Sequence, residues 1–229
     1  MSKPSIVRLE NVRKTYQMGS VPVEVLRGIT LEINSGEYVS IMGPSGCGKS
    51  TMLNLLGCLD QPTAGRYLLD EKDVSTLDDD SLSTIRGAKL GFIFQSYNLI
   101  QQLTVLENIE VPLYYQGRPE AESRDIAMEL AKIVGLEHRL HHKPRELSGG
   151  QQQRAGIARS LANDPLVLLA DEPTGNLDSS SGKDILKIFE DLHHRGTPII
   201  MVTHDPGIAE LTTRTIRLRD GQIENDVRR

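Results

Sequence analysis

The sequence predicts an α/β fold with a mainly parallel sheet, an N-terminal antiparallel β layer and a helical subdomain insert. Short apolar segments of strand length alternate with segments of helical periodicity near both ends of the chain, whereas the middle is mostly helical. A chain of 229 residues suits one large domain. We expect residues 1–95 and 161–229 to form the α/β core and residues from about 96 to 160 to form the helical subdomain.

The first third of the chain supplies the predicted β layer and the first buried strand. Ile6–Leu9, Val23–Leu26 and Ile29–Ile33 are rich in β-branched residues and predict short antiparallel strands. Tyr38–Met42 is a compact apolar run, which is typical of a buried strand. The helix expected over Lys49–Leu59 has a broad apolar face made of Met52, Leu53, Leu55, Leu56 and Leu59.

Three more strands and two more helices follow from the same patterns. The strands are expected at Gly91–Phe94, Leu166–Ala170 and Pro198–Thr203. The helices are expected at Glu120–Val134 and Ser181–His193. Their apolar positions are Ile126, Leu130, Ile133 and Val134 in the first, and Ile185, Leu186, Phe189 and Leu192 in the second.

Composition limits the function classes. A net charge of −5 and only 4% aromatic residues, with no Trp, disfavour a protein that coats nucleic acid. The two cysteines, Cys47 and Cys58, fit a reducing compartment. No run approaches the roughly 18 apolar residues of a membrane helix, and residues 1–4 lack the apolar part of a secretory signal. We therefore expect a cytoplasmic location.

A phosphate-binding loop follows the buried strand. The motif G-x-x-x-x-G-K-[ST] is matched in full by Gly43, Pro44, Ser45, Gly46, Cys47, Gly48, Lys49 and Ser50, with Thr51 next in the helix. The backbone N–H groups of such a loop surround phosphates at a positively polarised helix start. Lys49 can reach the β- and γ-phosphates, and the Ser50 hydroxyl can bind Mg²⁺. The alternative is a chance match, which the flanking strand and helix disfavour, so we expect a P-loop NTPase core.

An acidic pair ends the apolar run that begins at Leu166. Asp171 lies at the carboxyl end of that predicted strand, where ligands bind in open α/β sheets. We expect Asp171 to act on Mg²⁺ directly or through a water molecule, and Glu172 to polarise the attacking water. Without other motifs, Asp171 and Glu172 would indicate only an ordinary acidic pair where a strand passes into a loop. The presence of the phosphate loop favours the functional interpretation.

A second helix start is suited to an anion. Ser148 and Gln151 form a capping-box pattern, and Gly149 and Gly150 allow a close approach to backbone N–H groups. A plain helix cap is the alternative. Because one nucleotide has one γ-phosphate, we infer that each of these helix starts serves the nucleotide held by another copy. Two chains would then face head-to-tail as a homodimer around two ATP molecules.

The phosphate loop, the run LSGGQ at 147–151 and the run LVLLADE at 166–172, in this order, resemble the ATP-binding cassette family. The resemblance covers nearly the whole chain, and LSGGQ downstream of a phosphate loop is highly specific. It implies ATP and Mg²⁺ as ligands and ATP hydrolysis as the activity.

The resemblance also assigns roles to four further residues. Tyr16 resembles the aromatic residue that stacks on adenine, and Gln95 the glutamine that contacts Mg²⁺ and water and signals toward the membrane partner. Asp178 lies in a run, Asn176-Leu177-Asp178, that resembles the loop crossing the dimer interface, and His204 resembles the histidine contacting the γ-phosphate. Each has a structural alternative: half-buried packing for Tyr16, turn capping for Gln95, helix capping for Asp178 and a turn for His204.

A finer resemblance concerns the partner. Asn98-Leu99, the run LTVLEN at 103–108 and the run PTGNLDS at 173–179 are similar to the branch with MacB-type efflux, lipoprotein-release and FtsE-like cell-division ATPases. This branch implies an integral membrane permease subunit, with a periplasmic or extracellular adaptor reached through it, and a peripheral place on the inner face of the membrane. Export or extrusion is the expected function; regulation of cell-wall remodelling is the alternative.

The helical insert offers apolar residues for a groove that would take a short helix of the membrane partner. The sequence does not separate those that face the core from those that are exposed. The set is Tyr97, Leu99, Ile100, Leu103, Val105, Val111, Leu113, Tyr114 and Tyr115.

Other nucleotide-binding classes fit less well. A chromosome-maintenance ATPase needs a long coiled coil between the phosphate loop and LSGGQ, and a translation-associated cassette protein normally has two cassettes. A P-loop GTPase leaves LSGGQ unexplained, and the base-reading run Asn-Lys-x-Asp does not occur.

Overall fold

The computed structural model of the protein describes residues 4–229, so most of the N-terminal segment judged for a secretory signal lies outside the described residues. The chain divides into two compact units. One contains the residues up to Arg86 together with His193–Arg229, and the other is Gly87–Leu192. The helical insert of residues 96–160 in an α/β core stays a prediction.

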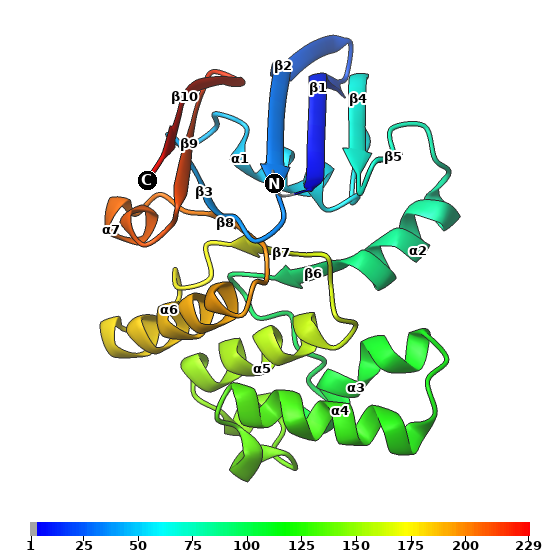
Figure 1. Ribbon diagram of the computed structural model, residues 1–229, viewed down its shortest axis with the longest axis vertical. Coiled ribbons are helices and arrows are strands. Elements are labelled where there is room, and N and C mark those ends of the chain that lie inside the picture. The colour runs from blue at the N-terminus through cyan, green and yellow to red at the C-terminus, as the bar shows by residue number, and fades with distance from the viewer. Residues whose placement is uncertain (1–3) are drawn as a thin grey trace. The chain divides into compact units, whose positions relative to one another are not determined.

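The N-terminal sheet is antiparallel, as the sequence predicts. Its strand order is β2-β1-β4-β5 (Figure 1), with β1 at Ser5–Met18, β2 at Val21–Asn34, β4 at Ala64–Leu69 and β5 at Lys72–Asp73. The prediction of two separate strands around Gly28 was wrong, because both belong to the continuous strand β2. The register with β1 shifts on either side of Val12, so bulges at Asn11 (φ 50°) and Gly28 (φ 88°) absorb the irregularity without ending the strand.

A second group of strands in the same unit surrounds β3 (Tyr38–Met42), which is buried along its whole length as predicted. It pairs in parallel with β8 (Ile199–Val202) on one side and with β9 (Arg214–Arg219) on the other; β10 (Gln222–Arg228) is antiparallel to β9. The helices α1 (Lys49–Leu56), α2 (Asp79–Lys89) and α7 (Pro206–Glu210) follow β3, β5 and β8 in the chain.

Helix α1 is shorter than predicted. Its C-cap is Gly57, and Cys58 takes a left-handed conformation with φ of 52°, which stops the helix before Leu59. The residues predicted on its apolar face from Met52 to Leu56 are buried. Leu59, by contrast, is 49% exposed and lies beyond the helix, so the prediction that it belongs to this apolar face was wrong.

The unit Gly87–Leu192 combines two parallel strands with helices. Strand β6 (Leu90–Ile93) pairs with β7 (Val167–Asp171). Figure 1 shows the helices grouped beside one another, and α3, α4 and α5 contact each other. The bounds are α3 Val105–Tyr115, α4 Glu120–Ile133, α5 Gly149–Leu161 and α6 Ser179–His194, with single 3-10 turns at Glu137–Arg139 and Pro144–Glu146.

The buried face of α4 differs from the prediction. Its buried residues are the small Ser123, Ala127 and Ala131, because small side chains let packed helices approach closely, whereas Ile133 is 40% exposed. Ile126 and Leu130 are half-buried, and only Val134 just beyond the helix is fully buried. In α6 the predicted residues Ile185, Phe189 and Leu192 are buried, and Leu186 is half-buried.

Within residues 4–229, none of the helices combines the length and the apolar character that crossing a bilayer requires.

A buried arginine joins several strands of the first unit. Arg214 on β9 donates two hydrogen bonds to the Asp226 carboxylate on β10, at 2.8 and 2.6 Å. Its Nη1 also donates to Glu37 Oε2 at 2.8 Å and to the Glu32 carbonyl at 2.7 Å. Because Arg214 is 4% exposed, its charge depends on these partners rather than on water.

We predict that Arg214→Met lowers the free energy of unfolding by about 3 kcal/mol at pH 7, because it leaves two carboxylates without their common partner. The hydrogen bonds from Arg214 lower the pKa of Asp226. Their contribution is therefore full above the unfolded-state value of about 3.9 and is lost as the pH falls through the lowered folded value. Urea unfolding at pH 7 and at acid pH should show the difference from the wild type shrinking with acid.

The matched control is Arg219→Met on the same strand. Arg219 and Glu224 form an ion pair whose side chains are 66% and 40% exposed, so its loss should change stability by less than about 1 kcal/mol. Equal effects of the two variants would contradict the role given to Arg214.

Candidate functional site

The phosphate loop connects β3 to α1 in the first unit and is shaped by close backbone contacts. A Cβ added at Gly43 (φ 155°) would lie 2.3 Å from the Leu218 carbonyl oxygen and 2.6 Å from Cys47 Sγ. At Gly48 (φ 106°) it would lie 2.8 Å from Leu26 Cδ2. Both positions therefore require glycine. Gly43 and Gly48 are the two glycines that the motif specifies, and a side chain fits at neither position.

Most of the rest of the loop is exposed to solvent. Pro44, Ser45, Gly46 and Ser50 are exposed, whereas Cys47 is buried and Thr51 is half-buried on α1. Lys49 Nζ donates to the carbonyl oxygens of Gly43 and Pro44 at 2.8 and 2.9 Å, so its ammonium lies against the backbone at the start of the loop. This is the position from which a lysine can meet phosphates held by the loop.

His204 lies at the same edge as the phosphate loop. Strands β3 and β8 are parallel with Ile41 opposite Val202, and the N–H of Thr203 donates to the Ile41 carbonyl at 3.2 Å. The exposed His204 and the loop therefore both follow the carboxyl ends of neighbouring strands. The next residue has a structural role: Asp205 caps α7 by accepting from the Gly207 N–H at 2.8 Å.

In the second unit, β6 and β7 bring Gln95 and the acidic pair to one edge. The strands are parallel with Ile93 opposite Ala170, so Gln95 and Asp171 both come at their carboxyl ends. Gln95 Nε2 donates to Asn176 Oδ1 at 3.2 Å, and Asn176 Nδ2 donates to the Gln95 carbonyl at 3.0 Å. Gln95 is thus joined to the loop that carries Asp178.

The loop after β7 has a constrained backbone. Glu172 has a φ of 43°, an uncommon left-handed conformation for this residue type, and its carbonyl accepts from the Gly175 N–H at 3.0 Å. A Cβ at Gly175 would lie 2.7 Å from Gln95 Nε2, so a side chain there would displace Gln95. The backbone of this turn therefore holds Glu172 in a left-handed conformation and leaves room for the Gln95 side chain.

Asp178 caps α6, which agrees with the helix-capping role given as the alternative for this residue. Its carboxylate accepts from the N–H groups of Ser180 and Ser181, both at 3.0 Å, and from their hydroxyls at 2.8 and 2.7 Å. The hydrogen bonds from Ser181, followed by those from Ser180, hold the pKa of Asp178 far below its ordinary value. Asp178 is therefore ionised at neutral pH.

The helix start at Ser148 has the predicted capping box. Ser148 Oγ accepts from the Gln151 N–H at 3.3 Å, and Gln151 Oε1 accepts from the Ser148 N–H at 3.0 Å. The two glycines have a packing role as well: a Cβ on Gly149 would lie 2.8 Å from the Tyr97 hydroxyl, and one on Gly150 would lie 3.0 Å from Ser181 Oγ. The first turn of α5 has no acidic residue to repel an anion.

Comparison with known proteins identifies the family. Residues 26–175 match the ABC transporter family. The chain belongs to the ABC transporter family, and it is an ATP-binding cassette ATPase. It is 52% identical over 98% of its length to an uncharacterized ABC transporter ATP-binding protein of Thermotoga maritima, of which the match covers 96%.

Two other proteins are similar to this chain over nearly its whole length. A macrolide export ATP-binding/permease protein MacB of Brucella melitensis is 53% identical over 99% of this chain, which spans only 35% of that protein. The cassette MJ0796 of Methanocaldococcus jannaschii, solved as a dimer in a post-hydrolysis state bound to ADP and Pi, has a TM-score of 0.89 and 48% identity. That match covers 97% of this chain and 98% of the solved one.

The residues predicted to bind Mg²⁺ carry side chains of the chemical type that this ion prefers. The predicted donors are the Ser50 hydroxyl, the Gln95 amide and the Asp171 carboxylate, all hard oxygen ligands. Among residues 4–229 there is no group of three or more His, Cys, Asp or Glu side chains placed to hold a metal.

Tyr16 of the cassette has a partner that sequence reasoning missed. Its hydroxyl donates to Asp60 Oδ2 at 2.8 Å. Burial raises the pKa of Tyr16, and the hydrogen bond to Asp60 raises it further, whereas one with Thr51 lowers it. Asp60 follows α1 in a segment with no periodicity, so no pattern in the sequence connects it with Tyr16.

Arg159 makes a second contact that the sequence analysis did not predict. It extends from α5 to the segment after Gln95, donating to the Asn98 carbonyl at 2.6 Å and to the Tyr97 carbonyl at 3.1 Å. Tyr97 and Asn98 both have positive φ, at 63° and 49°. Burial lowers the pKa of Arg159, and the two carbonyl contacts stabilise its guanidinium without a carboxylate. This residue therefore joins the helix of Ser148 to the segment of Gln95.

Proposed function

We propose that the cassette binds and hydrolyses ATP–Mg²⁺ at two sites shared between two head-to-tail copies, and so drives an integral membrane partner in export or extrusion. The observation that carries the proposal is the phosphate loop between β3 and α1, whose two close-contact positions are both glycine. The dimeric solved cassette bound to ADP and Pi supports the shared sites. The similarity to a MacB export protein supports the direction of transport.

Each residue has a stated task in the proposed reaction. Lys49 and the loop N–H groups bind the phosphates, and Tyr16 stacks on the base. Bound Mg²⁺, held by Ser50, Gln95 and Asp171, would neutralise charge on the β- and γ-phosphates. Glu172 accepts a proton from the water that attacks the γ-phosphorus, the bond to the β–γ bridging oxygen breaks, and ADP and phosphate leave.

Four further residues are proposed to contact the γ-phosphate or the attacking water. Gln95 and His204 contact it or its water from within the same chain, and Ser148 and Gly150 of the second copy approach it from the opposite side. Because Gln95 is hydrogen-bonded to Asn176, and Asp178 follows in the same loop, a change at the γ-phosphate has a short route to the dimer interface.

The surface proposed for the membrane partner lies on α3 and the loop before it. Of the apolar residues of the insert, Leu99, Val105 and Leu113 are buried, and Tyr97, Leu103 and Val111 are half-buried. Tyr114, Tyr115 and Ile100 are exposed, at 77%, 84% and 40%. The buried Asn108 fixes the loop by hydrogen bonds to the N–H and carbonyl of Ile100, at 2.8 and 3.1 Å. Two exposed tyrosines at the end of α3 and an exposed isoleucine in the fixed loop before it suit contact with a short helix of the partner.

Glu172→Gln should retain ATP binding and dimerisation but cut turnover by about 100-fold or more, because an amide cannot accept the proton. Steady-state ATPase assays and sizing chromatography with ATP measure the two properties. Glu129→Gln on the exposed side of α4 is the control and should keep wild-type turnover. Wild-type turnover in Glu172→Gln would remove Glu172 from the reaction.

Ser148→Arg should leave nucleotide binding by the single chain nearly intact and prevent the ATP-dependent dimer, because the bulky side chain enters the shared site. The loss of the cap should also cost about 1 kcal/mol of stability. Thr104→Ala is the control for this cost, since Thr104 caps α3 with the same kind of box, and it should dimerise normally. Unchanged dimerisation of Ser148→Arg would contradict the shared site.

Tyr114→Ser with Tyr115→Ser should weaken binding to the membrane partner by about tenfold or more, as expected for interface tyrosines, without changing the ATPase rate of the isolated chain. Photo-crosslinking from position 115 in cells, with mass spectrometry, identifies the protein contacted. An integral membrane permease supports transport, and a membrane protein of cell-wall remodelling supports the alternative. Leu211→Ser, at a 58% exposed residue of the other unit, is the control. Capture of soluble proteins alone would contradict the docking surface.

A further inference from the structure

Three side chains of the first unit form a compact cluster around the ring of Tyr16. Asp60 accepts from the Tyr16 hydroxyl at 2.8 Å through Oδ2 and from Lys14 Nζ at 2.5 Å through Oδ1. Lys14 Nζ also lies over the Tyr16 ring, 4.9 Å from its centroid. Asp60 is the common partner of the other two residues, which come from β1.

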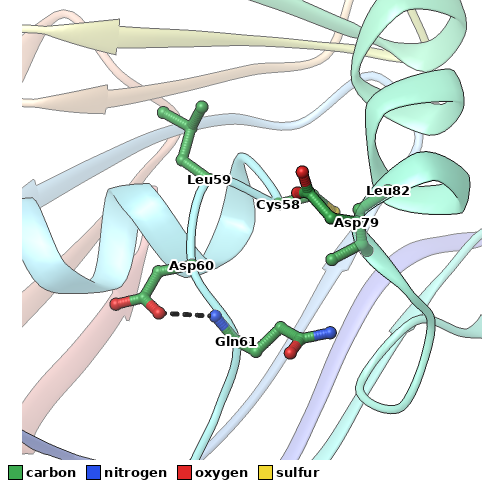
Figure 2. Close-up of a pocket in the computed structure, with 6 residues that line it drawn as sticks. All are labelled: Cys58, Leu59, Asp60, Gln61, Asp79 and Leu82. Atoms are coloured by element: carbon green, nitrogen blue, oxygen red, sulfur yellow. Dashed lines mark hydrogen bonds between the residues drawn. The ribbon is translucent and has the colours of Figure 1, made fainter.

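Asp60 is itself held in place by its own segment. Its Oδ1 accepts from the Gln61 N–H at 2.7 Å, and Lys14 Nζ donates to the Gln61 carbonyl at 2.8 Å. The segment Cys58–Gln61 lines a pocket together with Asp79 and Leu82, and Figure 2 shows the Asp60 carboxylate turned away from Asp79. Arg86 and Gln61 fix the segment by hydrogen bonds to the carbonyls of Cys58 and Leu77, at 2.7 and 2.5 Å.

The charge on Asp60 determines that this residue accepts each hydrogen bond of the cluster. Burial acts to raise the pKa of Asp60, but hydrogen bonds from Lys14, Tyr16 and the Gln61 N–H outweigh it, so the pKa is lowered. The carboxylate is therefore ionised at neutral pH and can only accept. The Lys14 and Asp60 side chains are 11% and 27% exposed, so their attraction is less weakened by water than that of a surface pair.

A stacking contact depends on where the ring lies. Tyrosine has two side-chain torsions, and a ring anchored at its hydroxyl loses less freedom when a base stacks on it. The cation over the ring restricts it further by an attraction to the π-face. Both restraints on the Tyr16 ring involve Asp60: one directly through the hydroxyl, and the other through Lys14.

We propose that Asp60 is a positioning residue that holds the Tyr16 ring, directly and through Lys14, as the platform on which the base of the bound nucleoside triphosphate stacks. This inference rests on the proposed stacking role of Tyr16. It assigns to Asp60 an effect on binding of the base, with no contact to the phosphates or the reacting water.

The test compares ATP with inorganic tripolyphosphate, which has the phosphates without a base. Dissociation constants for both are measured by calorimetry, with KM and kcat for ATP, on Tyr16→Phe, Asp60→Ala and the double variant. Each single variant should weaken ATP binding by about 3- to 10-fold, the range for one hydrogen bond. The double variant should be no weaker than the more affected single one. Tripolyphosphate binding should not change, and for Asp60→Ala the loss should appear in KM rather than in kcat.

Two further variants complete the design. Asp60→Asn retains an acceptor for the Tyr16 hydroxyl, so it should bind ATP better than Asp60→Ala. Asp73→Ala is the matched control: Asp73 pairs with Arg66 at 3.0 Å on the surface of the same unit, and its loss should leave ATP binding unchanged. Should Asp60→Ala fail to fold, Tyr16→Phe carries the test, since it leaves the Lys14–Asp60 pair intact.

The outcomes separate this inference from the proposed function. If Tyr16→Ala leaves ATP binding unchanged, the stacking role itself is wrong. If Tyr16→Ala weakens ATP binding while Tyr16→Phe and Asp60→Ala do not, only the role of Asp60 is overturned. Equal losses for ATP and tripolyphosphate in Asp60→Ala would also overturn it, because they would indicate a general structural effect.

Discussion

Parallel strand pairing is the constraint that places the phosphate loop, His204, Gln95 and Asp171 of the candidate site. In a parallel pair the carboxyl ends lie at the same edge, so residues far apart in the sequence follow neighbouring strands there. The pairing of β3 with β8 does this for the phosphate loop and His204 in one unit. The pairing of β6 with β7 does it for Gln95 and Asp171 in the other. Neither arrangement depends on the loops themselves, so the loops are free to carry chemistry.

Each loop is then shaped by close contacts and by local hydrogen bonds. Glycine is required where the phosphate loop meets the Leu218 carbonyl, and a side chain at Gly175 would displace Gln95. N–H groups in the first turns of two helices are satisfied locally, by Asp178 at the start of α6 and by the box of Ser148 and Gln151 at the start of α5. The same hydrogen bonds that stabilise these helix starts also fix the groups proposed to meet nucleotide. The capping role and the proposed functional role of these residues are therefore compatible.

The motif residues were predictable because each has a local signal. A phosphate loop, a capping box and an acid after an apolar run are short patterns with a direct physical meaning, and the structure places them as expected relative to their own strands and helices. The residues that the sequence did not reveal act across long separations. Asp60 meets Tyr16 on another element, and Arg159 meets the carbonyls of Tyr97 and Asn98. Contacts of this kind leave no periodicity, because they depend on how elements pack.

The sequence by itself determined the α/β class, the order of strands and helices near the phosphate loop, and the chemical types gathered for a nucleotide. These follow from local physics: side-chain periodicity, helix capping and the conformational freedom of glycine. Only the tertiary structure decided that β2 is one bulged strand, that α4 buries its small residues, and which apolar residues of the insert are exposed. Burial and register are properties of packed elements, since each depends on what lies opposite. A single chain segment does not carry that information.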